Sequence, residues 1–120
     1  MIKVLIASND EPTWEVFRKF IERKGYSVGI VHTDSDIITY VEKEKPRIIL
    51  LIRGLGIEGF NVLKRVKEID SSIKIIFVPW GDEYDEEIES AKELGTVTFL
   101  YKVFRLKEFE KLLLELSQNG

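Results

Sequence analysis

Apolar and polar positions along this chain alternate between short apolar runs and longer stretches with helical spacing. The apolar runs predict strands at Lys3–Ala7, Ser27–His32, Ile48–Ile52, Lys74–Val78 and Thr96–Lys102. The intervening periodicity predicts helices at Thr13–Lys24, from the Thr33–Asp36 capping residues through Val41, at Phe60–Ile69, at Asp82–Leu94 and around Leu106–Leu116. Five β-α units in strict alternation predict a parallel sheet with helices on both faces.

The uniformity of the strands predicts their order in the sheet. The first, third and fourth runs are the most apolar, as strands buried on both faces are. The second and fifth are patchy, as edge strands are. We therefore predict an α/β, flavodoxin-like (βα)5 doubly wound sheet of order 2-1-3-4-5 and a single domain over residues 1–120.

The turn residues support these boundaries. Pro12 fits a first helical turn, where its missing N–H is not needed, and Gly25 fits the end of the first helix. In the first helix we expect Val16, Phe17, Phe20 and Ile21 to form the apolar stripe.

Composition narrows the function classes. The chain has no Cys, which excludes disulfides, thiolate metal sites and cysteine nucleophiles. Its net charge of −3 argues against binding a phosphate backbone. No apolar run approaches the length of a membrane span, so we expect a cytoplasmic protein. The high share of Ile, Lys and Glu, with Gln118 the only Gln, hints at a thermophilic source.

In such a sheet the functional crevice lies beyond the carboxyl ends of the central strands. The residues expected there share a position just at or after a strand end. They are Asn9, Asp10 and Glu11, then Ile52 and Arg53, then Pro79 and Trp80, and finally Lys102.

Over essentially its whole length, the chain resembles the receiver domain of two-component response regulators. The matching segments are ASNDEP, PRIILLIRGLGIEGFNVLKRVKEID and FLYKVFRLKEFEKLLLEL. In that family an acidic pair holds Mg²⁺, an Asp accepts the phosphoryl group, and a hydroxyl residue and a Lys complete the site. Carried over by position, the resemblance implies Asn9 and Asp10 for the pair, Ile52 for the acceptor, Pro79 for the hydroxyl residue and Lys102 for the Lys.

These departures remove the chemistry that phosphoryl transfer needs, namely an oxygen nucleophile and a divalent ion. Ile52 has no oxygen, and Pro79 has neither a hydroxyl nor an N–H. Asp10 is the only matched carboxylate, whereas Mg²⁺ prefers several oxygen ligands. We therefore expect a degenerate pseudo-receiver with no metal, no cofactor and no enzymatic activity.

The cations next to Asp10 allow two interpretations. Arg53 and Lys102 could form an anion-binding pocket, or they could form a salt-bridge cluster with Asp10, which we favour. If Arg53 takes the place of the metal, adding Mg²⁺ should leave the melting temperature unchanged.

Three functions remain open. The favoured one is a stand-alone module that acts in signalling without phosphorylation by binding another protein or a second copy of itself, with no output domain attached. The resemblance implies an interaction face on the fourth helix, fifth strand and fifth helix, here with Tyr84, Ile88, Phe99 and Tyr101. The alternatives are a receiver phosphorylated at Asp10 or Glu58, and a small-ligand binder that uses Trp80 and the loop with Gly54, Gly56 and Gly59.

Overall fold

The computed structural model describes residues 2–8, 11–52, 59–78, 97–99 and 106–118. Along the chain its elements are β1 (Lys3–Ala7), α1 (Glu11–Arg23), β2 (Ser27–Val31), α2 (Asp34–Glu44), β3 (Ile48–Ile52), α3 (Gly59–Ile69), β4 (Lys74–Val78), β5 (Val97–Phe99) and α5 (Leu106–Gln118). The helix predicted at 82–94 lies outside the described residues.

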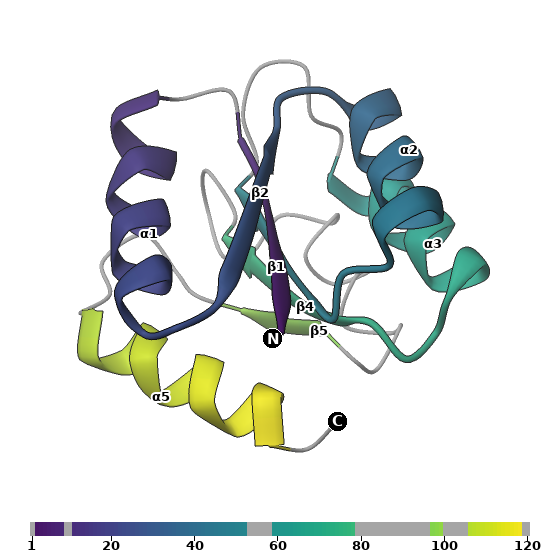
Figure 1. The fold of residues 1–120 in the computed structure, drawn as a ribbon. Coiled ribbons are helices and arrows are strands. Elements are labelled where there is room, and N and C mark those ends of the chain that lie inside the picture. Colours follow the sequence, from purple (N-terminus) through teal and green to yellow (C-terminus); the bar gives the residue numbers. More distant parts are fainter. Residues whose placement is uncertain (1, 9–10, 53–58, 79–96, 100–105, 119–120) are drawn as a thin grey trace.

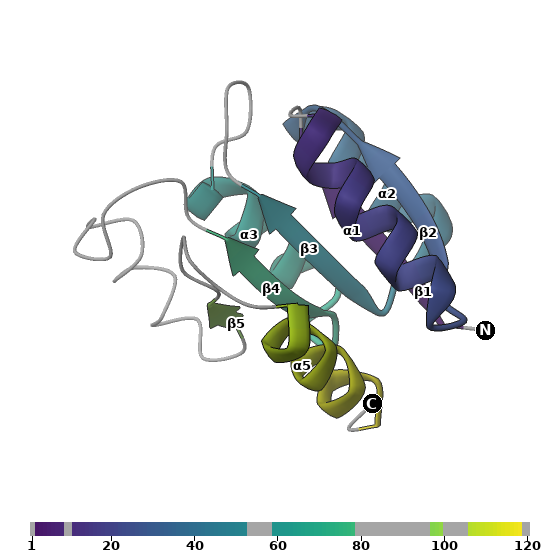
Figure 2. The ribbon, with the colours of Figure 1, turned by 90° about the vertical axis from the view of Figure 1, so that its left-hand side faces the viewer.

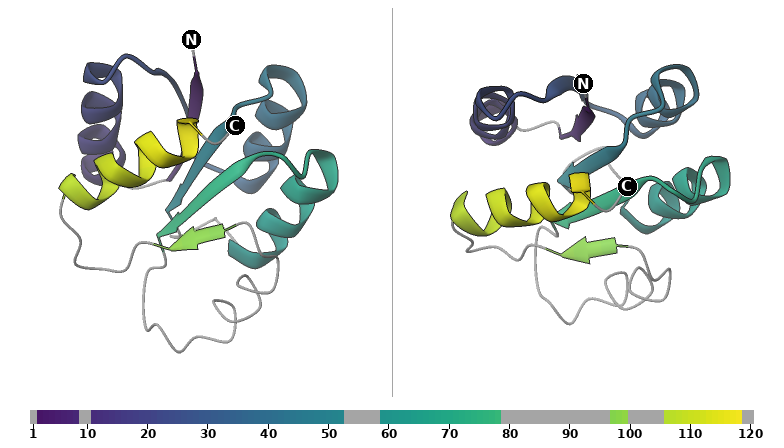
Figure 3. Two further views of the ribbon diagram at one scale, coloured as in Figure 1. Left: turned by 90° about the horizontal axis from the view of Figure 1, so that it is seen from below. Right: turned by 60° about the horizontal axis from the view of Figure 1, so that its bottom comes forward.

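The sheet has the order β2-β1-β3-β4-β5, and all four pairings are parallel, which confirms the predicted topology. Helices α1 and α5 cover one face of the sheet, and α2 and α3 cover the other (Figures 1 and 3). Seen from the side of α1, the strands follow one another from β2 to β5 (Figure 2).

β3 is the middle strand of the sheet, and its residues are buried on both faces. Its five residues alternate between two core clusters, with Ile49 and Leu51 facing α2 and α3, and Ile48, Leu50 and Ile52 facing α1 and α5. All five are at most 2% exposed, so no polar group would find water there. This burial on both sides is what a continuous apolar run indicates in a parallel sheet.

The predicted capping residues have the expected roles. Thr33 caps α2, and its hydroxyl accepts a hydrogen bond from the N–H of Asp36 at 3.2 Å. Gly25 has a φ of 91°, a conformation that glycine adopts without strain at a helix end. The C-cap of α2 is Lys45, which adopts the left-handed conformation just before Pro46.

The prediction for the face of α1 is wrong at one position. Phe17 and Ile21 are buried against the sheet and Phe20 packs against Phe109 of α5, but Val16 is 54% exposed. On a helix, residues i and i+4 share a face. Phe17 and Ile21 define the face toward the sheet, and Val16 stands on the flank, one turn before Phe20.

Strand β2 ends one residue earlier than predicted, at Val31, so His32 is not part of it. Helix α3 ends at Ile69 as predicted, and this last residue is 38% exposed. Of the predicted fifth strand, the structure describes Val97–Phe99, and the residues on either side of it lie outside the described part.

Candidate functional site

The candidate site is the end of the sheet where the strands finish. Ile52 is the last residue of β3, pairs in register with Val78, the last residue of β4, and is 2% exposed. Both belong to the cluster under α1 and α5, which also contains Phe17 and Phe109. Their rings meet edge to face, with centroids 4.9 Å apart. The position that the resemblance assigns to a phosphoryl acceptor is therefore occupied by a buried aliphatic side chain.

The residue that directly follows β1 is Ser8, which is 1% exposed and is the only buried polar side chain in the described part of the chain. Its N–H donates a hydrogen bond to the carbonyl oxygen of Val31 at 3.1 Å. This bond ties the end of β1 to the end of the neighbouring strand.

His32 completes this corner of the site. Its Nδ1 lies 2.8 Å from the carbonyl oxygen of Ser8. A carbonyl oxygen only accepts hydrogen bonds, so Nδ1 carries the hydrogen. The ring of Trp14, from the first turns of α1, lies against the imidazole with centroids 5.9 Å apart and an angle of 42° between the planes.

Sequence reasoning singled out neither Ser8 nor Trp14, and it placed His32 only as the last residue of a predicted strand. The signal for Ser8 is a polar residue directly after the buried apolar run Val4–Ala7 of β1. Nothing in the sequence indicated that His32, after β2, bonds to Ser8 at the end of the adjacent strand β1, because that contact depends on the register of β1 against β2.

Of the other predicted site residues, Glu11 is the first residue of α1 and is exposed. Asn9, Asp10, Arg53, Pro79 and Lys102 lie outside the described residues, as do Glu58, Trp80, Tyr84, Ile88 and Tyr101. Phe99 is the last residue of β5 and pairs in register with Phe77. The proposed salt-bridge cluster of Asp10, Arg53 and Lys102 and the interaction face therefore stay predictions.

Several shifted ionisable groups lie at the opposite end of the sheet, where the strands begin. The ammonium of Lys3 is 2.6 Å from a carboxylate oxygen of Glu44, and this contact raises the pKa of Lys3 and lowers that of Glu44. Burial lowers the pKa of Lys67, whose Nζ donates to the carbonyl oxygen of Ile73. Hydrogen bonds from Ser72 lower the pKa of Asp70. These groups join helix ends to strand starts and lie away from the candidate site.

Within the described ranges, no three acidic or histidine side chains are grouped so that they could hold a metal ion. No helix of that part is both long and apolar enough to cross a membrane. The described part of the site therefore contains the imidazole of His32, the hydroxyl of Ser8 and the buried aliphatic side chains of Ile52 and Val78.

Similarity to known proteins identifies the family of this chain. The sequence profile of the response regulator receiver domain matches residues 4–114. Sporulation initiation phosphotransferase F of Bacillus subtilis is 30% identical over 107 residues, which cover 88% of this chain and 86% of that protein. The transcriptional regulatory protein YkoG of the same organism is 26% identical, and there the match covers 98% of this chain but only 52% of the relative.

Solved structures agree on the fold. A two-component response regulator from Clostridium difficile superposes with a TM-score of 0.88 at 21% identity, covering 98% of this chain and 97% of that one. A CheY-like receiver domain protein from Methanospirillum hungatei gives a TM-score of 0.85 at 21% identity, covering 100% and 99%. With the profile match and the topology, these similarities show that the chain belongs to the family of response regulator receiver domains.

Proposed function

We propose that this receiver domain works without phosphorylation at the usual position, as a module that binds another signalling protein. The observation that carries this proposal is Ile52. It ends the central strand, it is 2% exposed, and it packs in the cluster beneath α1 and α5. A phosphoryl acceptor must be an oxygen, nitrogen or sulfur nucleophile that the donor can reach, and an aliphatic side chain supplies none.

The neighbouring strand end supports the same interpretation. Val78 is 5% exposed and lies beside Ile52 in register, so the two central strands finish in an apolar pair. In the sequence the next residue is Pro79, which has no group that could donate to a phosphoryl oxygen. An apolar floor of this kind stabilises the core, and a charged phosphoryl group would be poorly solvated beside it.

The Bacillus subtilis relative is named as a phosphotransferase. For this chain, the same role would require a carboxylate other than position 52, and Asp10 and Glu58 are the candidates that the sequence offers. We favour the binding role because it needs only the receiver shape. Its proposed contact face comprises Tyr84, Ile88, Phe99 and Tyr101, its proposed location is the cytoplasm, and it needs no metal or cofactor.

Incubation with acetyl phosphate and Mg²⁺, followed by intact-mass measurement, tests the proposal. We expect no added phosphoryl group, and no beryllofluoride complex when beryllium and fluoride replace the donor. A receiver domain with an acceptor Asp, treated in parallel, controls for the reagents. A phosphorylated product that disappears in Asp10→Asn or Glu58→Gln would show that a different carboxylate accepts the phosphoryl group, and it would overturn a function independent of phosphorylation.

A second experiment tests the binding role. Wild-type protein and the double variant Ile88→Ala/Tyr101→Ala are used to capture partners from lysate of the source organism. We expect a partner that the wild type retains and the variant loses. Equal capture by both would reject this face as the contact surface.

A further inference from the structure

The outer edge of β2 (Ser27–Val31) is not part of the contact face proposed above. β2 is an edge strand of the sheet: it pairs with β1 on one side, and no described element pairs with its other side. In Figure 1 it lies at the front, with α1 on its left and α2 on its right and no ribbon before it. Its residues are all half-buried.

The hydrogen bonds to β1 show which backbone groups of β2 are free. Ser27 donates its N–H to the carbonyl oxygen of Ile2 at 3.0 Å, and Val31 accepts from the N–H of Ser8 at 3.1 Å. In a parallel pair, the groups of alternate residues point to the same neighbour. Ser27, Gly29 and Val31 therefore face β1, whereas the N–H and C=O groups of Val28 and Ile30 point away from the sheet.

This edge lacks the features that normally prevent strands from pairing. Natural edge strands carry a charge, a proline or a bulge that blocks further pairing. The segment SVGIV has none of these side chains, and it is paired in unbroken register with β1. Two outward N–H groups and two outward C=O groups beside Val and Ile side chains form a template for another strand.

We propose that two copies of this chain associate through β2, antiparallel, around a two-fold axis at Gly29. In this register Val28 lies opposite Ile30 of the second copy, and the four outward groups of each strand are satisfied by four hydrogen bonds across the seam. Apolar side chains meet apolar side chains, and the strand has no charge to meet its like. This self-complementarity is the reason for choosing a second copy as the occupant.

Gly29 suits the centre of that seam. A residue opposite itself on the axis would form a non-hydrogen-bonded pair, in which the two Cα atoms approach to about 4.5 Å. The space above Gly29 is already filled by Tyr40 of α2, whose Oη would lie 2.3 Å from a Cβ at that position. At the axis, the two Gly29 residues therefore approach without side chains between them, and Tyr40 of each copy packs over its own Gly29.

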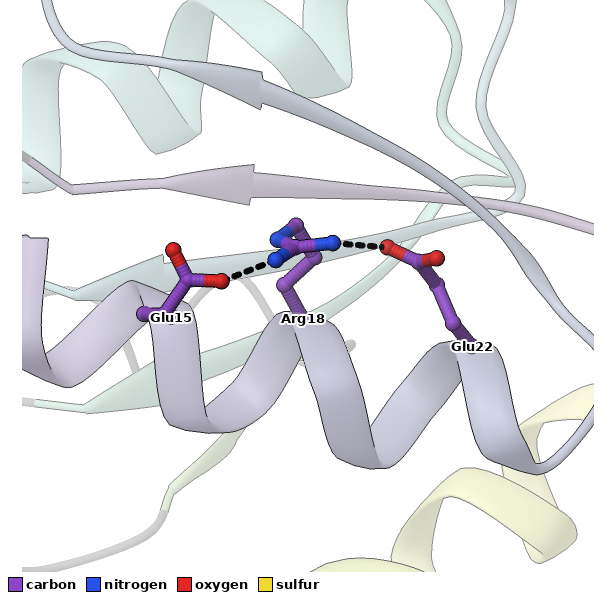
Figure 4. A network of polar contacts seen from close by, with 3 residues as sticks. All are labelled: Glu15, Arg18 and Glu22. Carbon is purple, nitrogen blue, oxygen red and sulfur yellow. Dashed lines mark hydrogen bonds and ion pairs between the residues drawn. The ribbon is translucent and has the colours of Figure 1, made fainter.

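The surfaces beside the strand carry balanced charges. On α1, Arg18 lies between Glu15 and Glu22 and bonds to both, at 2.8 Å from Glu22 (Figure 4). On the α2 side, a groove of about 260 Å³ is lined by Val31, Asp36, Thr39, Tyr40, Lys43 and Glu44. Both flanks contain cations and carboxylates, so a two-fold contact does not place surfaces of a single sign against each other.

Val28→Pro is the variant that tests this interface. It removes an outward N–H and leaves the bonds to β1 intact, because proline is tolerated where the N–H faces solvent. The matched control, Val28→Ala, removes more side chain but keeps the N–H. By sedimentation equilibrium up to the millimolar range, we expect wild type and Val28→Ala to form dimers. Val28→Pro should dissociate at least about tenfold more readily, because two of the four hydrogen bonds are lost.

Amide hydrogen exchange on the unmodified chain gives an answer that does not depend on how the variant folds. Protection of Val28 and Ile30 should rise with protein concentration, while Gly29 and Val31 stay protected at every concentration. The proposal is overturned if the wild type stays monomeric, if Val28→Pro dimerises as tightly as wild type, or if protection of Val28 and Ile30 is independent of concentration. A monomer would leave this edge to an extended segment of a different protein.

Discussion

At the scale of single residues, Gly29 is the position where one added methyl group should be felt most directly. A Cβ there would lie 2.3 Å from Oη and 2.6 Å from Cζ of Tyr40, far inside van der Waals contact. Gly29→Ala must therefore displace the tyrosine ring from β2. We expect a loss of about 1–2 kcal/mol in the free energy of unfolding, measured by urea denaturation.

A double-mutant cycle isolates this cause. In the Tyr40→Ala background the ring is absent, so Gly29→Ala should cost much less, and the two changes should be strongly non-additive. Additive losses would mean that the strain comes from the backbone of β2 and that Tyr40 is not responsible.

Asp70 predicts how stability depends on acid. Its Oδ1 accepts two bonds from Ser72, from the N–H at 2.9 Å and from the hydroxyl at 2.6 Å, and they lower the pKa of the carboxyl. A carboxyl whose folded pKa is depressed contributes stability above its unfolded pKa, and that contribution is lost as pH falls through the folded value. Carboxyl NMR titration should place the pKa of Asp70 below its usual range.

The matched variant is Asp70→Asn, which keeps an acceptor oxygen but cannot ionise. Its urea midpoint should fall less than that of wild type between neutral pH and the acid limb. A pKa of Asp70 at or above the ordinary value would show that the turn at Ser72 does not hold the carboxylate.

At the scale of elements, α1 offers a direct comparison of neighbouring residues. Phe17 is 4% exposed and meets Phe109 edge to face, whereas Val16 is 54% exposed. We expect Phe17→Ala to cost about 3–5 kcal/mol of unfolding free energy, because it removes a core ring and leaves a cavity. Val16→Ala should stay within about 0.5 kcal/mol of wild type. A comparable loss for both would mean that Val16 is covered.

The elements differ in how well the sequence predicts them. Strand identity and sheet order follow from which runs are uniformly apolar, as Ile48–Ile52 against Ser27–Val31 shows. Caps follow from local chemistry, as at Thr33 and Gly25. The inward face of α1 was predicted one residue too wide, because hydrophobicity alone does not fix the rotation of a helix on its sheet.

The candidate site was predictable where it depends on position along a strand and unpredictable where it depends on pairing. That Ile52 ends the central strand could be read from the apolar run. The link from His32 to the carbonyl oxygen of Ser8 could not, since it requires β1 and β2 to lie in a particular register. The free edge at Val28 and Ile30 is likewise visible only once the hydrogen bonds of Ser27 and Val31 are known.

At the scale of the whole molecule, the central question is whether position 52 belongs to the core or to a site. If it belongs to the core, Ile52→Asp should behave as a buried charge, with a loss on the order of 3 kcal/mol or more in unfolding free energy. Ile52→Val keeps the chemistry and removes one methyl group, so it should cost about 0.5–1.5 kcal/mol.

These two variants separate the interpretations because the core reaches Ile52 from several elements. The side chain shares its cluster with Ile76 and Val78 of β4 and with Phe17 of α1, so a carboxylate there would lose water without gaining a partner among those side chains. Thermal denaturation and acetyl phosphate labelling of both variants should show a strongly lowered melting temperature for Ile52→Asp and no phosphoryl group on either. If Ile52→Asp is as stable as Ile52→Val, water and ions reach position 52, and the sheet end is an open site, contrary to its placement in the core.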